Sequence, residues 1–168
     1  PLLVGTHTGG LNALITVHST LVLVAGGFFA AAGLGILRKG VWTDRAAESW
    51  QMSLSYCATV AFVVVWTLLA IFGVLPAFYT HAGGYTSLRT AVFAAAALAF
   101  LVAAGCFFLI YRRRPSYFAL FIGASLAIFG TTLGSSLLTG AVSGSQIVWV
   151  VRAGQWISGI YLFAGALS

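Results

Sequence analysis

The chain has 168 residues, of which 61% are hydrophobic and only 6% are charged, and its mean hydropathy is +1.05. Soluble domains are about a quarter charged, so this composition excludes a water-soluble fold, and with it collagen, disulfide scaffolds and disordered tails. The net charge of +6 reflects eight Lys and Arg residues against two Asp and Glu. Most of these cations flank apolar stretches, which indicates membrane topology and predicts no nucleic-acid partner. We therefore expect a multi-pass integral membrane protein in the lipid bilayer.

Five apolar stretches are long enough to cross a bilayer, whose hydrocarbon core of about 30 Å needs roughly 20 helical residues. They cover residues 11–37, 53–76, 88–111, 116–138 and 147–167. Because lipid offers no hydrogen bonds to the backbone, each stretch is predicted to be an α-helix. Thr43 or Asp44 can cap a helix that begins at Arg45, which predicts an extension of the second helix. The expected fold is all-α, a single transmembrane domain over residues 1–168 built as a five-helix bundle.

The orientation follows from the distribution of the cations. Six of the eight lie in the connections after the first and third stretches: Arg38, Lys39, Arg45, Arg112, Arg113 and Arg114. Only Arg89 and Arg152 lie toward the other side. Cytoplasmic connections of membrane proteins carry an excess of Lys and Arg, so the amino terminus is expected outside and the carboxyl terminus inside the cell. The expected location is a cell membrane of the prokaryotic inner-membrane type. Arg112, Arg113 and Arg114 anchor this topology and are candidate ligands for anionic lipid headgroups.

Small residues recur at four-residue spacing in three of the stretches. The pairs are Gly26 with Ala30, Gly130 with Gly134, and Gly154 with Ser158. Helices associate in lipid through close packing at such positions. The default interpretation is packing inside the bundle, and the alternative is docking of other membrane subunits. The two cysteines, Cys57 and Cys106, form no ligand or disulfide spacing and are expected to be buried small hydrophobes.

Few ionisable groups lie within the stretches, and the lack of carboxylates and lysines there argues against several classes of membrane protein. Both carboxylates, Asp44 and Glu48, lie in a connection, and the one lysine, Lys39, lies at a helix end. A proton relay, a cation-coupled transporter or a retinal Schiff base would require such groups in the membrane. Arrangements of Ser, His and acid for nucleophilic catalysis are also lacking. We therefore expect that the chain is not an enzyme by itself.

Three histidines are candidate metal ligands on the outer side. His7 is expected before the first helix, His18 two turns inside it, and His81 in the loop after the second helix. Neutral imidazole is the commonest metal ligand in proteins and also ligates haem iron. At 3.6 residues per turn, His18 faces away from the polar face that carries Thr16 and Ser19. The alternative for His18 is a hydrogen bond to a backbone carbonyl or a neighbouring helix.

The fifth stretch contains Arg152, with Gln155 close by, and no in-membrane acid can pair with this arginine. Its guanidinium can reach the outer headgroups by snorkelling. Otherwise it binds an external group: a lipid phosphate, a quinone oxygen, a haem propionate or a carboxylate of another subunit. His18, Arg152 and Gln155 are therefore candidate cofactor-binding residues. If the first and fifth helices touch, His18 and Arg152 form one polar pocket.

These features predict an accessory integral subunit of a larger membrane complex, with respiratory and photosynthetic electron transfer as the candidate settings. In this role the chain contacts other membrane subunits through its small-residue helix faces. One alternative is the transmembrane sensor region of a signalling protein. The other is a membrane electron carrier with an outer-side haem held by His18. Haem, quinone and pigment all remain open as the cofactor.

Overall fold

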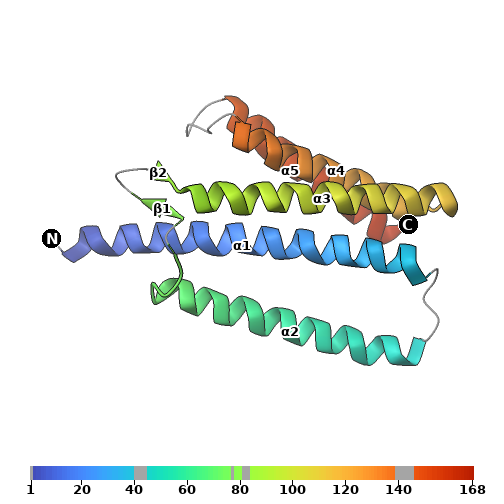
Figure 1. Cartoon of the computed structure of the whole chain (residues 1–168), viewed down its shortest axis with the longest axis horizontal. Helices are drawn as coiled ribbons and strands as arrows, with labels where there is room; N and C mark the ends of the chain where they lie inside the picture. Colours follow the sequence, from blue (N-terminus) through green and yellow to red (C-terminus); the bar gives the residue numbers. More distant parts are fainter. Residues whose placement is uncertain (1, 40–44, 77, 81–83, 139–145) are drawn as a thin grey trace. The chain divides into compact units, whose positions relative to one another are not determined.

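We describe the chain from a computed structural model. It describes residues 2–39, 45–76, 78–80, 84–138 and 146–168, and side chains at residues 10, 12–38, 54, 57–76, 78, 85–137 and 149–168. Five α-helices occupy the described residues: α1 (Leu2–Lys39), α2 (Arg45–Ile71), α3 (Ser87–Arg113), α4 (Tyr117–Leu138) and α5 (Gln146–Leu167). A short hairpin, β1 (Tyr79–Thr80) and β2 (Gly84–Tyr85), lies between α2 and α3 (Figure 1).

The helical, apolar character of the chain agrees with the prediction. Among the described residues, three helical segments are long and apolar enough to cross a membrane: Asn12–Arg38, Ser87–Arg113 and Tyr117–Leu137. In α2 the apolar stretch is shorter and covers Cys57–Ile71. The bounds of α3, α4 and α5 agree with the predicted stretches to within two residues. Membrane crossing by α2 and α5 stays a prediction.

The first helix is longer than predicted. It begins at Leu2 and not at residue 11, so His7 lies within α1 and not before it. The glycines at positions 9 and 10 lower helix propensity by about 1 kcal/mol each, but they keep their backbone N–H groups and leave the hydrogen-bond ladder intact. Only a proline would have removed a donor there.

The second helix begins at Arg45, as predicted, but ends at Ile71 and not at residue 76. Gly73 adopts a left-handed conformation with φ of 70°. Its N–H donates to the Ala70 carbonyl at 3.2 Å, and the Val74 N–H donates to the Leu69 carbonyl at 3.1 Å. This pair of bonds is a Schellman motif, which ends a helix where glycine can adopt a positive φ. The apolar residues that follow Gly73 therefore lie outside the helix.

The hairpin was not predicted. Its strands are antiparallel, with Tyr79 opposite Tyr85 and Thr80 opposite Gly84. The Thr86 N–H donates to the Phe78 carbonyl at 3.1 Å and extends the pairing by one bond. Strands of two residues are too short to produce the alternation of apolar and polar residues by which strands are recognised in a sequence.

The chain divides into two compact units. The first unit comprises residues 1–21 and 41–90, and the second comprises residues 22–40 and 91–168. The first therefore holds the beginning of α1, α2, the hairpin and the first turn of α3. The second holds the rest of α1 and α3 together with α4 and α5. Within the second unit, α4 and α5 lie side by side along their lengths (Figure 1).

The core of the second unit is formed mainly by alanines and phenylalanine rings, together with four larger aliphatic residues. Its buried cluster contains Val22, Phe93, Ala96, Ala97, Phe100, Ala103, Ala104, Phe107, Ile122, Leu126 and Leu133. Gly26, Gly130 and Gly154 of the predicted small-residue pairs lie against neighbouring helices here, whereas a Cβ at Gly134 would meet no described atom within 4 Å. A Cβ at Gly26 would lie 3.2 Å from Phe100 on α3, and one at Gly130 would lie 3.0 Å from Leu101. These positions pack inside the unit, which supports the default interpretation.

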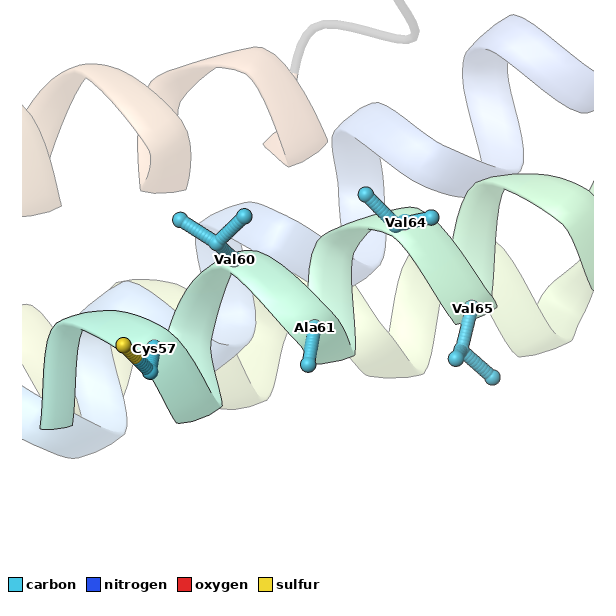
Figure 2. A pocket seen from close by; sticks show the side chains of 5 residues that line it. All are labelled: Cys57, Val60, Ala61, Val64 and Val65. Carbon is cyan, nitrogen blue, oxygen red and sulfur yellow. The ribbon is translucent and has the colours of Figure 1, made fainter. Parts of the chain in front are cut away.

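The two cysteines differ in exposure. Cys106 is buried in the second unit, as expected, whereas Cys57 is exposed, and the expectation of burial was wrong for it. Cys57 lines a shallow depression on α2 together with Val60, Ala61, Val64 and Val65 (Figure 2). In a membrane protein, lipid can cover an apolar side chain, so apolar sequence does not require burial within protein.

Candidate functional site

A partly open cavity of about 240 Å³ lies in the second unit and is lined by residues of α1, α3, α4 and α5. Most of its lining is apolar, with a polar group on α4 and α5. The lining residues are Ala25, Phe29, Phe100, Ser125, Leu126, Phe129, Gln155, Ser158, Gly159 and Leu162. Apolar cavities with a few polar groups are the usual form of small-molecule sites, so we take this cavity as the candidate site.

Three phenylalanine rings form one wall of the cavity. The rings of Phe100 and Phe129 meet edge to face with centroids 4.8 Å apart, and Phe29 lies 6.3 Å from Phe100. Edge-to-face contacts of this kind hold rings in defined positions. At Gly159 on α5, no heavy atom of the described residues lies within 4 Å of the place where a Cβ would lie. The cavity therefore combines a fixed aromatic wall with open space beside a residue that lacks a side chain.

The polar part of the lining is centred on two serines. Ser125 on α4 donates from Oγ to the Ser158 carbonyl at 2.8 Å, and Ser158 on α5 donates to the Ser125 carbonyl at 3.0 Å. The two Oγ atoms are 3.0 Å apart. The side chains are only 2% and 5% exposed. Each hydroxyl hydrogen therefore has an acceptor, while lone pairs on both oxygens remain available.

Gln155 is the remaining polar side chain of the lining. It was one of the predicted cofactor-binding residues, and it lies one turn before Ser158 on α5. Among the described residues, no hydrogen-bond partner is found for its side-chain amide. An amide carries two donors and an acceptor, and leaving these unpaired within a membrane costs free energy. The cavity thus contains a polar group that can bind a ligand.

Arg152 does not line the cavity. Its guanidinium carbon lies 5.7 Å from the centre of the Trp149 ring, a cation–π contact on the exposed side of α5. Arg152 and Gln155, predicted as parts of one site, therefore face different surroundings. His18 belongs to the first unit and Arg152 to the second, so a pocket shared by the two stays a prediction.

His18 is exposed, whereas Thr16 and Ser19 on the same helix are buried, as helical periodicity requires. Among the residues whose side chains are described, no group of three His, Cys, Asp or Glu could hold a metal ion. The predicted ligands His7 and His81 lie outside those residues, so a haem or metal at the three histidines stays a prediction.

Arg89 is part of a polar cluster in the first unit that the sequence analysis did not identify. Its guanidinium carbon lies 3.7 Å from the centre of the Tyr85 ring. Its backbone N–H is 3.4 Å from the Thr86 hydroxyl, which caps α3. The Asn12 side-chain oxygen accepts the Phe78 N–H at 3.0 Å and ties α1 to the hairpin. The available signal was topological, since Asn12 begins the apolar segment of α1 and Arg89 lies in the first turn of α3.

The arginines Arg112, Arg113 and Arg114 are exposed at the end of α3. Within the second unit, Gly26 faces Phe100 and Gly33 faces Cys106, so α1 and α3 run parallel. Arg38, at the end of α1, therefore lies at the same end of this unit as the three arginines. Lipid binding by this cluster stays a prediction.

Comparison with known proteins gives no relative. No family model matches the chain, and neither a curated protein nor a solved structure matches it.

Proposed function

We propose that the chain is an accessory integral subunit of a larger membrane complex, and that the outer face of α5 docks a transmembrane helix of another subunit. One stripe of exposed side chains carries the proposal. Its members recur at helical spacing on α5: Trp149, Arg152, Trp156, Ile160 and Phe163. Trp149 is 66% exposed and Trp156 is 78% exposed. We refer to these five residues as the α5 stripe.

The chemistry of the α5 stripe favours a protein partner. Trp and Arg are enriched among the residues that dominate binding energy at interfaces. An arginine within an apolar helix is costly in lipid unless a counter-charge meets it. The two carboxylates of the chain, Asp44 and Glu48, belong to the first unit, where Glu48 lies in the first turn of α2, whereas Arg152 belongs to the second unit. A carboxylate on a partner helix would complement Arg152.

The test is native mass spectrometry of the protein extracted with mild detergent from its own membranes. We expect co-migrating subunits, and we expect Arg152→Leu to release them. Arg113→Leu, which removes one exposed arginine at another helix end, is the matched control and should retain them. A bare 17.6 kDa species from the unaltered protein would refute the proposal. Retention of every subunit by Arg152→Leu would assign the arginine to lipid headgroups instead.

The proposal includes five membrane crossings, with the amino terminus outside and the carboxyl terminus in the cytoplasm. The gathering of Arg38 with the α3 arginines at one end of the second unit supports this orientation. Single cysteines at Ser87 and Ser116, with Cys57 and Cys106 replaced by alanine, test it in intact cells. A membrane-impermeant maleimide should label Ser87→Cys directly and Ser116→Cys only after permeabilisation. The reverse pattern would invert the topology.

A further inference from the structure

In the cavity of the second unit, the Gln155 amide has donors for which the described residues offer no acceptor, and this feature indicates what the cavity binds. We propose that the cavity holds the ring of a lipid-soluble quinone, with a quinone carbonyl accepting a hydrogen bond from the Gln155 amide. The inference does not depend on the proposed docking of α5, because the α5 stripe and the cavity share no residue.

The lining selects a neutral ligand. None of its ten described residues is ionisable. A carboxylate or an ammonium group would therefore enter without a counter-charge, at a high cost in desolvation. A fatty acid in its ionised form and a charged headgroup are both disfavoured. A ligand that is apolar over most of its surface, with a small number of neutral polar atoms, fits the lining.

The polar atoms of the lining select a carbonyl. The serine hydroxyl hydrogens are already donated to the Ser158 and Ser125 carbonyls. The donors that remain are those of the Gln155 amide, and they require an acceptor on the ligand. A quinone carries its carbonyl oxygens on an otherwise apolar ring. The lone pairs of the serine hydroxyls can accept hydrogen bonds from the reduced, hydroxyl-bearing form of the same ring.

The size and the aromatic wall select a ring. An apolar protein cavity of about 150 Å³ is large enough for benzene. The present cavity, at about 240 Å³, can therefore take a six-membered ring with substituents. Phe29, Phe100 and Phe129 offer edges and faces against which such a ring can stack. The cavity is partly open, so an isoprenoid or alkyl tail could leave it into lipid.

The experiment measures binding to the full chain in quinone-free nanodiscs by isothermal titration calorimetry. The probe is decylubiquinone, and decylbenzene is the matched ring without carbonyls. We expect the quinone to bind at least tenfold more tightly than decylbenzene. We expect Gln155→Leu, which keeps the volume of the side chain but removes the amide, to weaken quinone binding about tenfold. The same substitution should leave decylbenzene binding unchanged.

Two further variants separate loss of the site from loss of the fold. Gly159→Leu places a side chain at the open edge of the cavity, where a Cβ meets nothing within 4 Å, and should abolish binding of both probes. Thr131→Val is the control, because the Thr131 hydroxyl bonds only to carbonyls of its own helix and lies outside the cavity. It should bind as the unaltered protein does.

Three outcomes would overturn the inference. They are no binding of decylubiquinone, equal binding of the two probes, and unchanged quinone binding in Gly159→Leu. If Gln155→Leu fails to fold, the comparison of probes and the Gly159 variant still decide the matter. A failure of this inference leaves the subunit proposal intact, because that proposal is tested by co-migration of partners.

Discussion

In the second unit, helices meet mainly through alanines, glycines and phenylalanine rings, and the described hydrogen bonds between helices are those of the serine pair of α4 and α5. In the first unit, two of the described contacts between elements are directed and polar: an asparagine on a backbone N–H and a guanidinium on a tyrosine ring. The first kind of contact requires small side chains, because helix backbones can approach closely only where the side chains between them are small. The second depends on particular atoms being present.

This contrast predicts different sensitivities to substitution. Added volume should disturb the second unit most, because a packed helix pair can accept a larger side chain only by moving apart. Removal of a polar atom should disturb the first unit, but by less, because net hydrogen-bond contributions are small.

The largest effect is expected at Gly33 on α1. A Cβ at this position would lie 2.7 Å from the Cβ of Cys106 on α3, closer than carbon atoms approach in proteins. Gly33→Leu should therefore force α1 away from α3 and destabilise the protein by about 3 kcal/mol, the upper range for overpacking. The measurement is the free energy of unfolding in mixed micelles, with unfolding monitored by the loss of the helical circular dichroism signal.

Gly35 supplies the control two residues along the same helix. A Cβ there meets nothing within 4 Å. Gly35→Leu should change the free energy of unfolding by less than about 1 kcal/mol, the difference in helix propensity between glycine and leucine. Equal effects at the two glycines would show that α1 and α3 do not pack closely at Gly33.

The serine pair should give the next largest effect. Replacing Ser125 and Ser158 together with alanine removes both hydroxyls and both bonds between α4 and α5. Hydrogen bonds between membrane helices contribute about 0.6 kcal/mol on average, so the double variant should lose about 1–2 kcal/mol. Ser136→Ala is the control, because its hydroxyl bonds to Leu133 on its own helix. A double variant no less stable than the control would make the pair irrelevant to packing.

The helices were largely predictable because they are long and apolar. Loop signals such as Arg112 with Pro115 fixed the end of the third helix to within two residues. The errors fell where a short-range feature decided the structure. Gly73 ended α2 by adopting a positive φ among apolar residues, a conformation that hydropathy does not report. The hairpin was missed because its strands, at two residues each, are too short to show a pattern in the sequence.

The candidate site was predictable only in part. Gln155 stood out as a polar residue within an apolar stretch, and it lines the cavity. The serine pair did not stand out, because serine serves equally well as a small packing residue. The phenylalanine wall could not be found, since it joins Phe29 to residues on α3 and α4 whose pairing depends on helix rotation. Sequence periodicity gives the faces of a helix but not which faces meet.

A smaller effect is expected from the hydrogen bond between α1 and the hairpin. Asn12→Leu removes the oxygen that accepts the Phe78 N–H at 3.0 Å. This change should destabilise the local structure by about 1 kcal/mol, the usual net contribution of a hydrogen bond. Hydrogen exchange at the Phe78 amide should then be about fivefold faster.

Thr20→Val serves as the control for Asn12, since the Thr20 hydroxyl bonds to the Thr16 and Val17 carbonyls of its own helix. Exchange at Phe78 should be unaffected by it. If Asn12→Leu also leaves the exchange rate unchanged, the hairpin is held by other contacts, and the polar character of the first unit would not determine its stability.

The smallest effect is expected from the guanidinium of Arg89 on the ring of Tyr85. Arg89 takes part in more than one interaction, so a single substitution would not isolate its contact with the ring. A double-mutant cycle of Arg89→Met and Tyr85→Leu isolates the pair, with free energies of unfolding measured for all four proteins. The ring is 46% exposed, so we expect a coupling of about 0.5–1 kcal/mol, as for cation–π pairs at exposed sites. A coupling indistinguishable from zero would mean that Arg89 stabilises the beginning of α3 independently of the hairpin. The contrast between the two units would then rest on Asn12 alone.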